Sequence, residues 1–458
     1  MGPYLRDLAQ FVAIPSVSAQ PRHAPDVRAA AHWLTARLRG AGLTATTVRT
    51  GGHPVVLATW HGAPQAPTVL IYGHYDVQPP GLARRWSTPP FTPVRRGDRL
   101  HARGASDDKG QLLCHVAALR ALLRRHGRLP VNVTCLFEGE EEIASPSLPA
   151  LLDRYAPHLA ADVLLVSDTA MPAPGRPAIV RSLRGSATLD LRVTGPATNL
   201  HSGTYGGAVH NPAQALCTLI AGLHDPSGRV RVPGFYAGVR PLTATTRDDS
   251  LRRRAGVPAL WGLPDATPHD RTTIWPALSV HGLRAGYTGP GTSSIIPHAA
   301  LARLGIRVAP GQNPAAIARA VTRHLRAETP ETVRTTITTT STAAPILVPT
   351  TTPGLATAAA ACREVFGTPP VFTRSGGTIP ALGMLREVLG LDPVLLGFAL
   401  PGDNPHGPDE SVHLPTCRLG VATIAAFLRH LGHAAPLRGQ ALAASGHPPR
   451  LLIGERAP

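Results

Sequence analysis

Acidic and histidine side chains follow the predicted strands of this chain at the points where the strands end. They are His74 and Asp76, Asp107 and Asp108, Glu140, Glu141 and Glu142, Asp168, His201 and His406. One metal ion needs only three or four such ligands. The set can therefore fill two metal sites and still leave a carboxylate for proton transfer, which predicts metal-assisted hydrolysis.

The first pair stands in the stretch Tyr72-Gly73-His74-Tyr75-Asp76. On a regular strand His74 and Asp76 face the same side, because successive side chains alternate. His74 can then bind a metal ion while Asp76 accepts a hydrogen bond from the other ring nitrogen. A chance pair on a loop is the structural alternative.

The second pair, Asp107 and Asp108, comes directly before a predicted helix. Carboxylates also stabilise a helix N-terminus through capping and the helix dipole, so a purely structural role stays open. Two features favour function: glycines flank the pair at 104 and 110, and Lys109 is the only lysine of the chain. The spacing does not match a Walker phosphate-binding loop.

The glutamates at 138 and 140–142 directly follow a predicted buried strand. Like charges so close together repel one another unless cations compensate them. We expect one glutamate to bind metal and its neighbour to act as a general base, with a solvated acidic turn as the alternative. Asp168 ends a further apolar strand and could simply cap a turn. His406 lies in a polar loop, where His413 competes for the same role.

Apolar runs alternate with helical periodicity in the first part of the chain. Strands are expected at 68–72, 131–137 and 162–166, and helices at 26–41 and 110–126. This alternation predicts an α/β domain with a mostly parallel sheet covered by helices on both faces. Ligands of such sheets bind at the carboxyl ends of the strands, where the acids and histidines stand.

The pattern changes near Gly185. We expect strands at 187–194, 301–308 and 333–341 and helices at 211–224 and 314–327. They predict a smaller α+β domain at 186–342 with one open sheet face. This domain is inserted between residues 1–185 and 343–458, which together form the catalytic domain.

The last part of the chain returns to the pattern of the first. We expect a helix at 354–366, a glycine-rich turn at 375–377, a strand at 394–400 and a helix at 418–431. A Pro-, Gly- and Arg-rich excursion covers 228–300, and the tail beyond 434 is expected to be loosely ordered.

The composition bounds the class of protein. A chain of 458 residues is too long for one core, and its formal charge of +17 comes almost wholly from arginine. The arginines are scattered and aromatic residues make up only 4%, so we expect no nucleic-acid partner. Five widely spaced cysteines without a CxxC argue against disulfides and structural zinc clusters.

No targeting segment is expected. Arg6 and Asp7 interrupt the first apolar stretch, which therefore lacks a signal-peptide core. No run reaches the ~18 to 20 apolar residues that a spanning helix needs. We expect a cytoplasmic protein with no membrane partner.

Together the motifs resemble those of a known enzyme family. The matching stretches are YGHYDVQP (72–79), GASDDKGQ (104–111), EGEEEIASP (138–146), SDT (167–169), NLHSGTYGG (199–207) and PHGPDE (405–410). They are similar to motifs of the di-zinc metallopeptidases that include cytosolic non-specific dipeptidase, carnosinase, succinyl-diaminopimelate desuccinylase and aminoacylase. The dipeptidase branch is resembled most, through PGFY (233–236), RPLT (240–243), GYTGPGTSSIIP (286–297) and SGGTIP (375–380).

The resemblance implies two zinc ions, or manganese in some members, and a role for each matching residue. His74 and Asp168 would hold one ion, Glu142 and His406 the other, and Asp107 would bridge both. Asp76 would orient His74, Glu141 would be the general base, and the peptide bond between Asp107 and Asp108 would be cis. His201 would reach across a homodimer interface to the tetrahedral oxyanion, while Arg307, Gly376 and Gly377 would bind the substrate carboxylate.

Two positions depart from the family pattern. Ala144 replaces the usual glycine after the acidic cluster, and Ser375 stands where many dipeptidases carry an acid. His201 and Arg307 also have structural alternatives, as a helix-start residue and as a solvent-facing charge on a strand.

The activity that the resemblance implies is hydrolysis of small peptides, dipeptides with a free C-terminus. The inserted domain would serve as a lid and dimerisation domain. An N-acyl amino acid deacylase or desuccinylase would use the same site. A non-catalytic metal-dependent binding protein is the alternative of another class, and a base at Glu141 argues against it.

Overall fold

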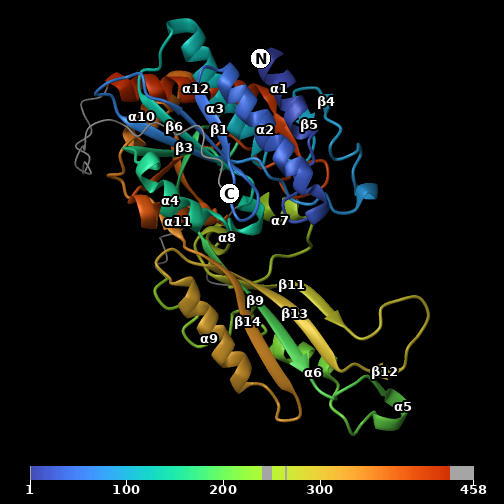
Figure 1. The fold of residues 1–458 in the computed structure, drawn as a ribbon. Coiled ribbons are helices and arrows are strands. Elements are labelled where there is room, and N and C mark those ends of the chain that lie inside the picture. The colour runs from blue at the N-terminus through green and yellow to red at the C-terminus, as the bar shows by residue number, and fades with distance from the viewer. Residues whose placement is uncertain (1, 240–249, 264–265, 434–458) are drawn as a thin grey trace. The chain divides into compact units, whose positions relative to one another are not determined.

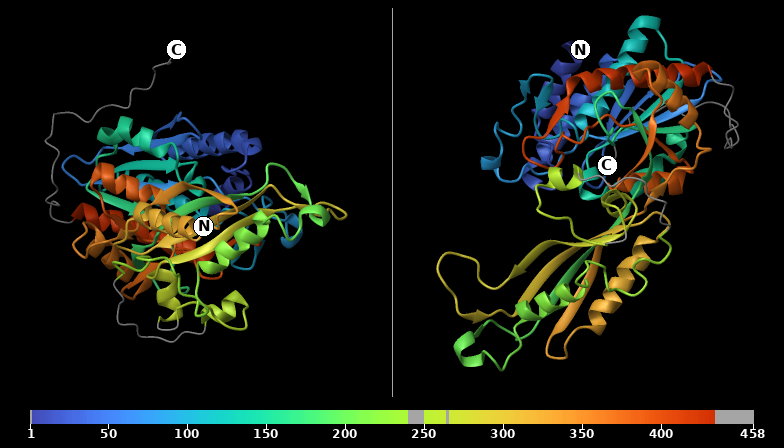
Figure 2. Two further views of the ribbon diagram at one scale, coloured as in Figure 1. Left: turned by 90° about the horizontal axis from the view of Figure 1, so that it is seen from below. Right: turned by 180° about the vertical axis from the view of Figure 1, so that it is seen from behind.

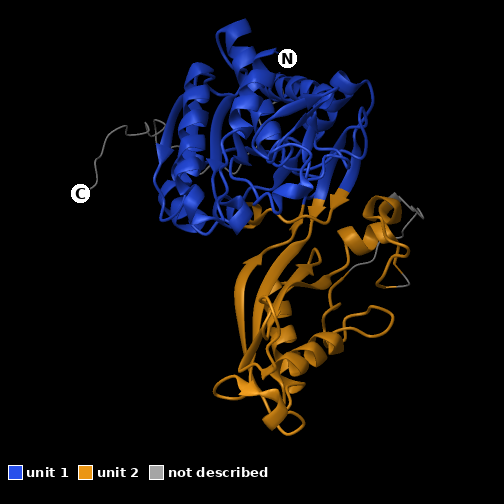
Figure 3. Cartoon of the chain, turned by 90° about the vertical axis from the view of Figure 1, so that its right-hand side faces the viewer, with its two compact units in different colours: residues 1–181, 348–373, 384–458 blue, residues 182–347, 374–383 orange. Residues whose placement is uncertain are grey.

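The computed structural model describes residues 2–239, 250–263 and 266–433. The chain divides into two compact units, residues 1–181, 348–373 and 384–458, and residues 182–347 and 374–383 (Figure 3). The second unit includes residues 374–383, which the division made from the sequence left in the last part of the chain. The expectations for residues 240–243 and for the tail beyond 434 lie outside the described residues.

The largest sheet has nine strands, and its central strands are parallel. Its main path runs β1 (Thr44–Val48), β2 (Val55–Trp60), β6 (Asn132–Glu138), β3 (Thr68–His74), β7 (Val163–Val166), β17 (Pro393–Leu395), β8 (Ala178–Leu183) and β15 (Ile346–Leu347) (Figure 1). Strands β6, β3, β7 and β17 are parallel to their neighbours in this group. The outer strands pair antiparallel. The mostly parallel sheet expected from the sequence is thus confirmed, with antiparallel pairing at its edges.

The strand expected at 394–400 covers only Pro393–Leu395, so its predicted end was wrong. Beyond Leu395 the backbone N–H groups of Phe398 and Ala399 donate to the Gln111 side chain, at 2.7 and 3.2 Å, and Ala399 keeps only an isolated parallel bridge with Ala170. An apolar run alone does not distinguish a strand from a buried loop.

Helices pack on this sheet and on one another. Strands β3 and β7 are buried along nearly their whole length, as expected for strands covered on both faces. Helix α2 (Ala24–Gly40) packs on β1 and β2, and α3 (Lys109–His126) contacts β3. Helix α12 (Leu414–His433) packs against α3 and α10 (Leu355–Phe366), and α1 (Gly2–Val12) lies on α3 (Figures 1 and 2).

Helix α3 matters most for function, because it starts directly after Asp107 and Asp108. It ends at Gly127, whose φ of 69° lets its N–H bond to the carbonyl oxygen of Leu123. The first unit also contains α4 (Leu148–Leu159) and a small sheet of β4 (Val94–Arg96), β5 (Arg99–His101) and β18 (Ser411–His413), while β16 (Val371–Ser375) and α11 (Pro380–Leu389) lie partly in each unit.

The second unit contains an antiparallel sheet in the order β11 (Ala277–Ala285), β13 (Ala299–Val308), β9 (Gly185–Thr194) and β14 (Arg334–Ala343). Helices α6 (Pro212–Gly222) and α9 (Pro314–Ala327) pack on it. Burial alternates along β9, with Leu189, Leu191 and Val193 fully buried in the core. This alternation is typical of a sheet with one covered and one open face.

The excursion at 228–300 has structure of its own. It contains α7 (Ser250–Ala255), α8 (Pro268–Thr273), β11 and β12 (Ile295–Ile296). Strand β12 pairs with β10 (Leu200–His201), which leads into α5 (Ser202–Tyr205). Among the described helices of the chain, none is long and apolar enough to cross a membrane.

Candidate metal centre

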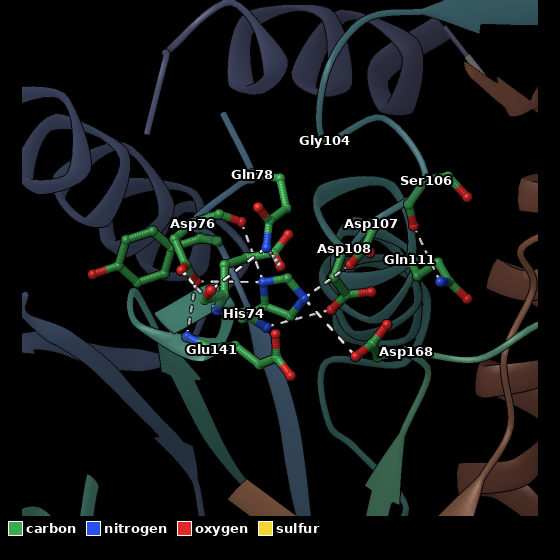
Figure 4. Close-up of polar contacts among 12 residues, drawn as sticks. His74, Asp76, Gln78, Gly104, Ser106, Asp107, Asp108, Gln111, Glu141 and Asp168 are labelled. Carbon is green, nitrogen blue, oxygen red and sulfur yellow. Dashed lines mark hydrogen bonds and ion pairs between the residues drawn. The ribbon is translucent and has the colours of Figure 1, made fainter. Parts of the chain in front are cut away.

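Predicted site residues of the first unit, among them His74, Asp107 and Asp168, meet at the carboxyl ends of the central strands (Figure 4). His74 is the last residue of β3, and the acidic turn Glu141–Ile143 follows β6 after two residues. Asp168 comes two residues after β7. These strands are parallel neighbours, so their ends open at the same edge of the sheet.

Among the residues that the structure describes, two groups of three side chains could each hold a metal ion. One is His74, Asp107 and Asp168, and the other is Asp107, Glu142 and His406. Within each group the ligand atoms lie within 4.8 Å of one another. Asp107 belongs to both, with Oδ1 at 3.1 Å from His74 Nε2 and Oδ2 at 3.0 Å from His406 Nε2. Its two oxygens therefore face two different ligand groups.

The spacing of these atoms fits the ligands of a small metal ion, for which zinc serves as the example. Two atoms each ~2.1 Å from one tetrahedral zinc ion are about 3.4 Å apart. His74 Nε2 lies 3.9 Å from Asp168 Oδ2, and His406 Nε2 lies 3.4 Å from Glu142 Oε2. Glu142 also keeps its other oxygen, Oε1, buried with no hydrogen-bond partner in the described chain. Such a buried acceptor needs a cation or a donor.

The electrostatics of the cluster also favour cations. Burial raises the pKa of Asp168 to about 7, and the charge of Asp107 adds to the rise. Burial likewise raises the pKa values of Glu141 and Glu142. Burial also acts to raise the pKa of Asp107, but hydrogen bonds from His406 and His74 outweigh it and lower that pKa. The raised pKa values of Asp168, Glu141 and Glu142 mean that these crowded, buried carboxyl groups resist ionisation when no cation compensates their charge.

Asp76 connects His74 to the acidic turn. Its carboxylate accepts hydrogen bonds from the backbone N–H groups of Glu141 and Glu142, at 3.2 and 3.1 Å. It also lies 3.4 Å from His74 Nδ1. Gln78 donates from Nε2 to Glu142 Oε2 at 2.7 Å, a contact that the sequence patterns did not predict although Gln78 lies in a quoted motif.

Asp108, Lys109 and His413, which neighbour the ligands in sequence, lie outside both groups. Asp108, joined to Asp107 by a cis peptide bond, is buried, and its Oδ2 accepts from the His74 N–H at 3.4 Å. Lys109 points elsewhere: its Nζ donates to the carbonyl oxygens of Phe11 and Ile14 at the end of α1. His413 bonds through Nδ1 to Thr416 Oγ1 at 2.8 Å.

Ala144 ends the acidic turn in a left-handed conformation, with φ of 71°. Ser145 follows with φ of 53°, and its hydroxyl donates to Glu138 Oε1 at 2.9 Å. The turn is thus kept without the usual glycine. A side chain in this conformation costs about 1 kcal/mol relative to glycine.

We expect Ala144→Gly to stabilise the protein by about 1 kcal/mol, because glycine adopts this conformation without strain. Urea unfolding of the metal-free protein measures the change. Ala359→Gly in the middle of α10 is the matched control, and it should destabilise by about 1 kcal/mol. An equal loss of unfolding free energy in both variants would contradict the proposed backbone strain at Ala144.

His201 lies in the second unit and is exposed. It precedes α5, and its Nδ1 accepts a hydrogen bond from the Gly203 N–H at 3.0 Å. The structural alternative, a residue at a helix start, therefore describes its local contact. Because Nδ1 accepts, the proton of the neutral ring sits on Nε2, which is a hydrogen-bond donor.

The predicted carboxylate-binding residues also lie together in the second unit. Arg307 Nη1 donates to Thr378 Oγ1 at 2.7 Å, next to Gly376 and Gly377. A Cβ atom on Gly376 would lie 1.9 Å from the Thr272 carbonyl oxygen, so only glycine fits there.

Arg184 is a buried neighbour of this turn, and the sequence patterns carried no signal for it. Its guanidinium donates to the backbone carbonyl oxygens of Gly376, Arg271 and Trp275. Burial and the nearby charge of Arg307 lower the pKa of Arg184 to about 10. Two cationic side chains thus stand beside one glycine turn.

Comparison with known proteins gives consistent matches over most of the chain. The family model described as peptidase family M20/M25/M40 matches residues 70–430. Beta-Ala-His dipeptidase of Homo sapiens is 31% identical over 390 residues, which covers 82% of this chain and 76% of that protein. Cys-Gly metallodipeptidase dug1 of Schizosaccharomyces pombe is 29% identical over 465 residues, covering 94% and 96%. The crystal structure of human carnosine dipeptidase 1 superposes with a TM-score of 0.86 at 29% identity, covering 94% of this chain and 96% of that one.

Proposed function

The chain belongs to peptidase family M20/M25/M40, and from this premise we propose that it is a metal-dependent hydrolase that cleaves dipeptides with a free C-terminus. Similarity to metallodipeptidases over nearly the whole chain supports this activity. The observation that carries the proposal is the Asp107 carboxylate, whose two oxygens face two separate ligand groups.

We assign His74 and Asp168 to one zinc ion, Glu142 and His406 to a second, and Asp107 to both. Imidazole nitrogens and carboxylate oxygens are the ligands that zinc takes in hydrolases, and manganese is the alternative. When bound, the ions supply positive charge that lowers the pKa of a water molecule and polarises the scissile carbonyl.

Glu141 is the proposed general base. Its carboxylate makes no hydrogen bond or ion pair with any residue that the structure describes, while Asp76 holds its backbone. Burial raises the pKa of Glu141, which brings its basicity closer to what proton transfer near neutral pH requires. Glu141 thus takes a proton from the attacking water and passes it to the leaving amine.

Arg307, Gly376 and Gly377 are the proposed binding site for the substrate carboxylate. The two cationic side chains at this turn support the proposal, since Arg184 makes no ion pair among the described residues and is nevertheless buried. A buried guanidinium gains most from an arriving anion.

The second unit is the proposed lid and dimerisation domain of a homodimer. His201 of one protomer would then donate from Nε2 to the oxyanion in the active site of its partner, a contact worth ~3 kcal/mol in comparable enzymes. The Nδ1 contact with Gly203, which leaves the proton on Nε2, supports this role. The cytoplasmic location stays a prediction.

A deacylase using the same site is the second candidate. Ser375 favours it, because its hydroxyl accepts from the Gly377 N–H and no carboxylate stands at this position to pair with a free amino group.

A substrate panel with metal analysis tests the proposal. We expect about two metal ions per chain and faster cleavage of β-Ala-His or Cys-Gly than of N-acetyl or N-succinyl amino acids. Dipeptide amides should be poor substrates, because they lack the carboxylate. Preferred cleavage of the acyl amino acids would select the deacylase. Metal binding without turnover of any substrate would favour the remaining alternative, a non-catalytic metal-dependent binding protein.

A further inference from the structure

Glu410, a buried acid outside both ligand groups, holds the backbone that carries Asp107. Its Oε1 accepts from the N–H groups of Ser106 and Asp107, at 2.9 and 3.1 Å. Its Oε2 accepts from the Gly104 N–H at 2.9 Å and from Arg103 Nη1 at 2.7 Å. One carboxylate thus receives four donors from residues 103–107.

Arg103 extends the same network to the other ligand segments. Its Nη2 donates to the His406 carbonyl oxygen at 2.9 Å and to the Pro79 carbonyl oxygen at 3.5 Å. Pro79 follows Gln78, which bonds to Glu142. The guanidinium also lies over the Trp86 ring, 5.2 Å from its centroid. Arg103 therefore links three segments by hydrogen bonds: through Glu410 the segment of Asp107, through its own contacts the loop of His406 and the residue after Gln78.

The loop that carries His406 needs such a support. His406 has a φ of 61°, and Asn404 and Asp409 have φ values of 57° and 56°. Left-handed conformations at residues other than glycine are strained and persist only where surrounding contacts hold them. Within this loop, Arg103 makes the contact at the His406 backbone.

A stabilising role alone does not account for the pair. Arg103 and Glu410 are 1% and 0% exposed, and buried ion pairs generally add little to stability compared with apolar residues of the same size. Every hydrogen bond that the two side chains make with the described residues goes to a segment that bears or supports a candidate ligand, or to the other member of the pair.

We infer that Arg103 and Glu410 are positioning residues that set the bridging aspartate, Asp107, at the right distance from His406. The inference rests on the proposed two-metal function, but part of it is testable without metal. Glu410 acts on Asp107 and so affects both ligand groups. Arg103 acts directly on the His406 loop and so affects mainly the group that contains His406.

Metal binding is the first test, on the full chain stripped of metal and titrated with Mn²⁺ or Zn²⁺ by calorimetry. Glu410→Gln keeps the size but turns one acceptor into a donor. We expect it to weaken both binding steps by about 10- to 100-fold, as loss of a ligand's supporting contacts does. Arg103→Met should weaken the step at the group that contains His406 by a similar factor and the other step clearly less. In the electron paramagnetic resonance spectrum of the Mn²⁺-loaded variants, the signal of spin-coupled ion pairs should give way to that of single ions.

Hydrogen exchange of the metal-free protein is the second test. Amides of residues 103–107 and 404–411 should exchange at least about tenfold faster in both variants, because Glu410 and Arg103 protect them. Arg120→Met is the control, since it removes an Arg–carboxylate ion pair of the same unit, between α3 and Asp7, that involves no ligand segment. It should change neither metal affinity nor exchange in these segments.

The two tests separate the outcomes. Unchanged exchange in folded variants would overturn the positioning role, and faster exchange with wild-type metal affinity would overturn its link to the ligands. If the wild-type chain binds no metal, the proposed function fails, while the exchange data still decide whether the pair holds the two loops. Arg103→Lys and Glu410→Asp, which keep the charges but shorten the reach, replace any variant that does not fold.

Discussion

Replacing Glu141 with glutamine will lower kcat by about 10²- to 10⁴-fold while two metal ions stay bound. Glutamine has the size of glutamate but cannot take a proton from water, and general bases contribute factors of this order. Glu141 belongs to neither ligand group, so its loss should leave metal content unchanged. Turnover of a dipeptide and metal content of the same sample measure the two quantities together.

Glu138→Gln is the control from the same acidic stretch. Glu138 is buried, and its Oε1 accepts from the hydroxyls of Tyr72 and Ser145, which a glutamine oxygen also does. Burial raises the pKa of Glu138 to about 7, so a neutral replacement changes little. We expect this variant to keep activity within about tenfold. Wild-type turnover in Glu141→Gln would show that another group takes the proton.

Replacing Asp107 with asparagine will remove the metal ions and the activity together. Asparagine offers one oxygen and one NH₂ group, so it cannot serve both His74 and His406 groups. We expect affinity for both ions to fall by more than about 100-fold, since losing only a supporting contact of a ligand costs 10- to 100-fold. Metal content after dialysis at a fixed free concentration measures the loss.

Asp108→Asn is the matched control on the neighbouring residue. Asp108 is also a buried carboxylate, and burial raises its pKa well above the ordinary value, so the neutral amide is a close substitute. It should keep about two metal ions. If Asp108→Asn loses metal and Asp107→Asn does not, the assignment of the bridging role to Asp107 is wrong.

The sequence by itself determined which kinds of residue stand at which strand ends. Apolar runs at 68–72, 131–137 and 162–166 predicted strands β3, β6 and β7 to within about two residues, because a strand buried on both faces needs continuous apolar side chains. Parallel neighbours end at one edge, so the meeting of His74, Asp168 and the acidic turn followed from the order of the elements.

Residue types and periodicity left the choice between neighbours of equal chemistry open. The family resemblance named Asp107 and His406, and only the tertiary structure shows the contacts that distinguish them. Asp107 and not Asp108 faces both histidines, and His406 and not His413 approaches Glu142. Each choice depends on backbone direction and on contacts between residues far apart in the chain, such as that of Arg103 with His406, 303 positions later. Residue type and local periodicity carry no information on such contacts, because the chain brings these residues together only when it folds.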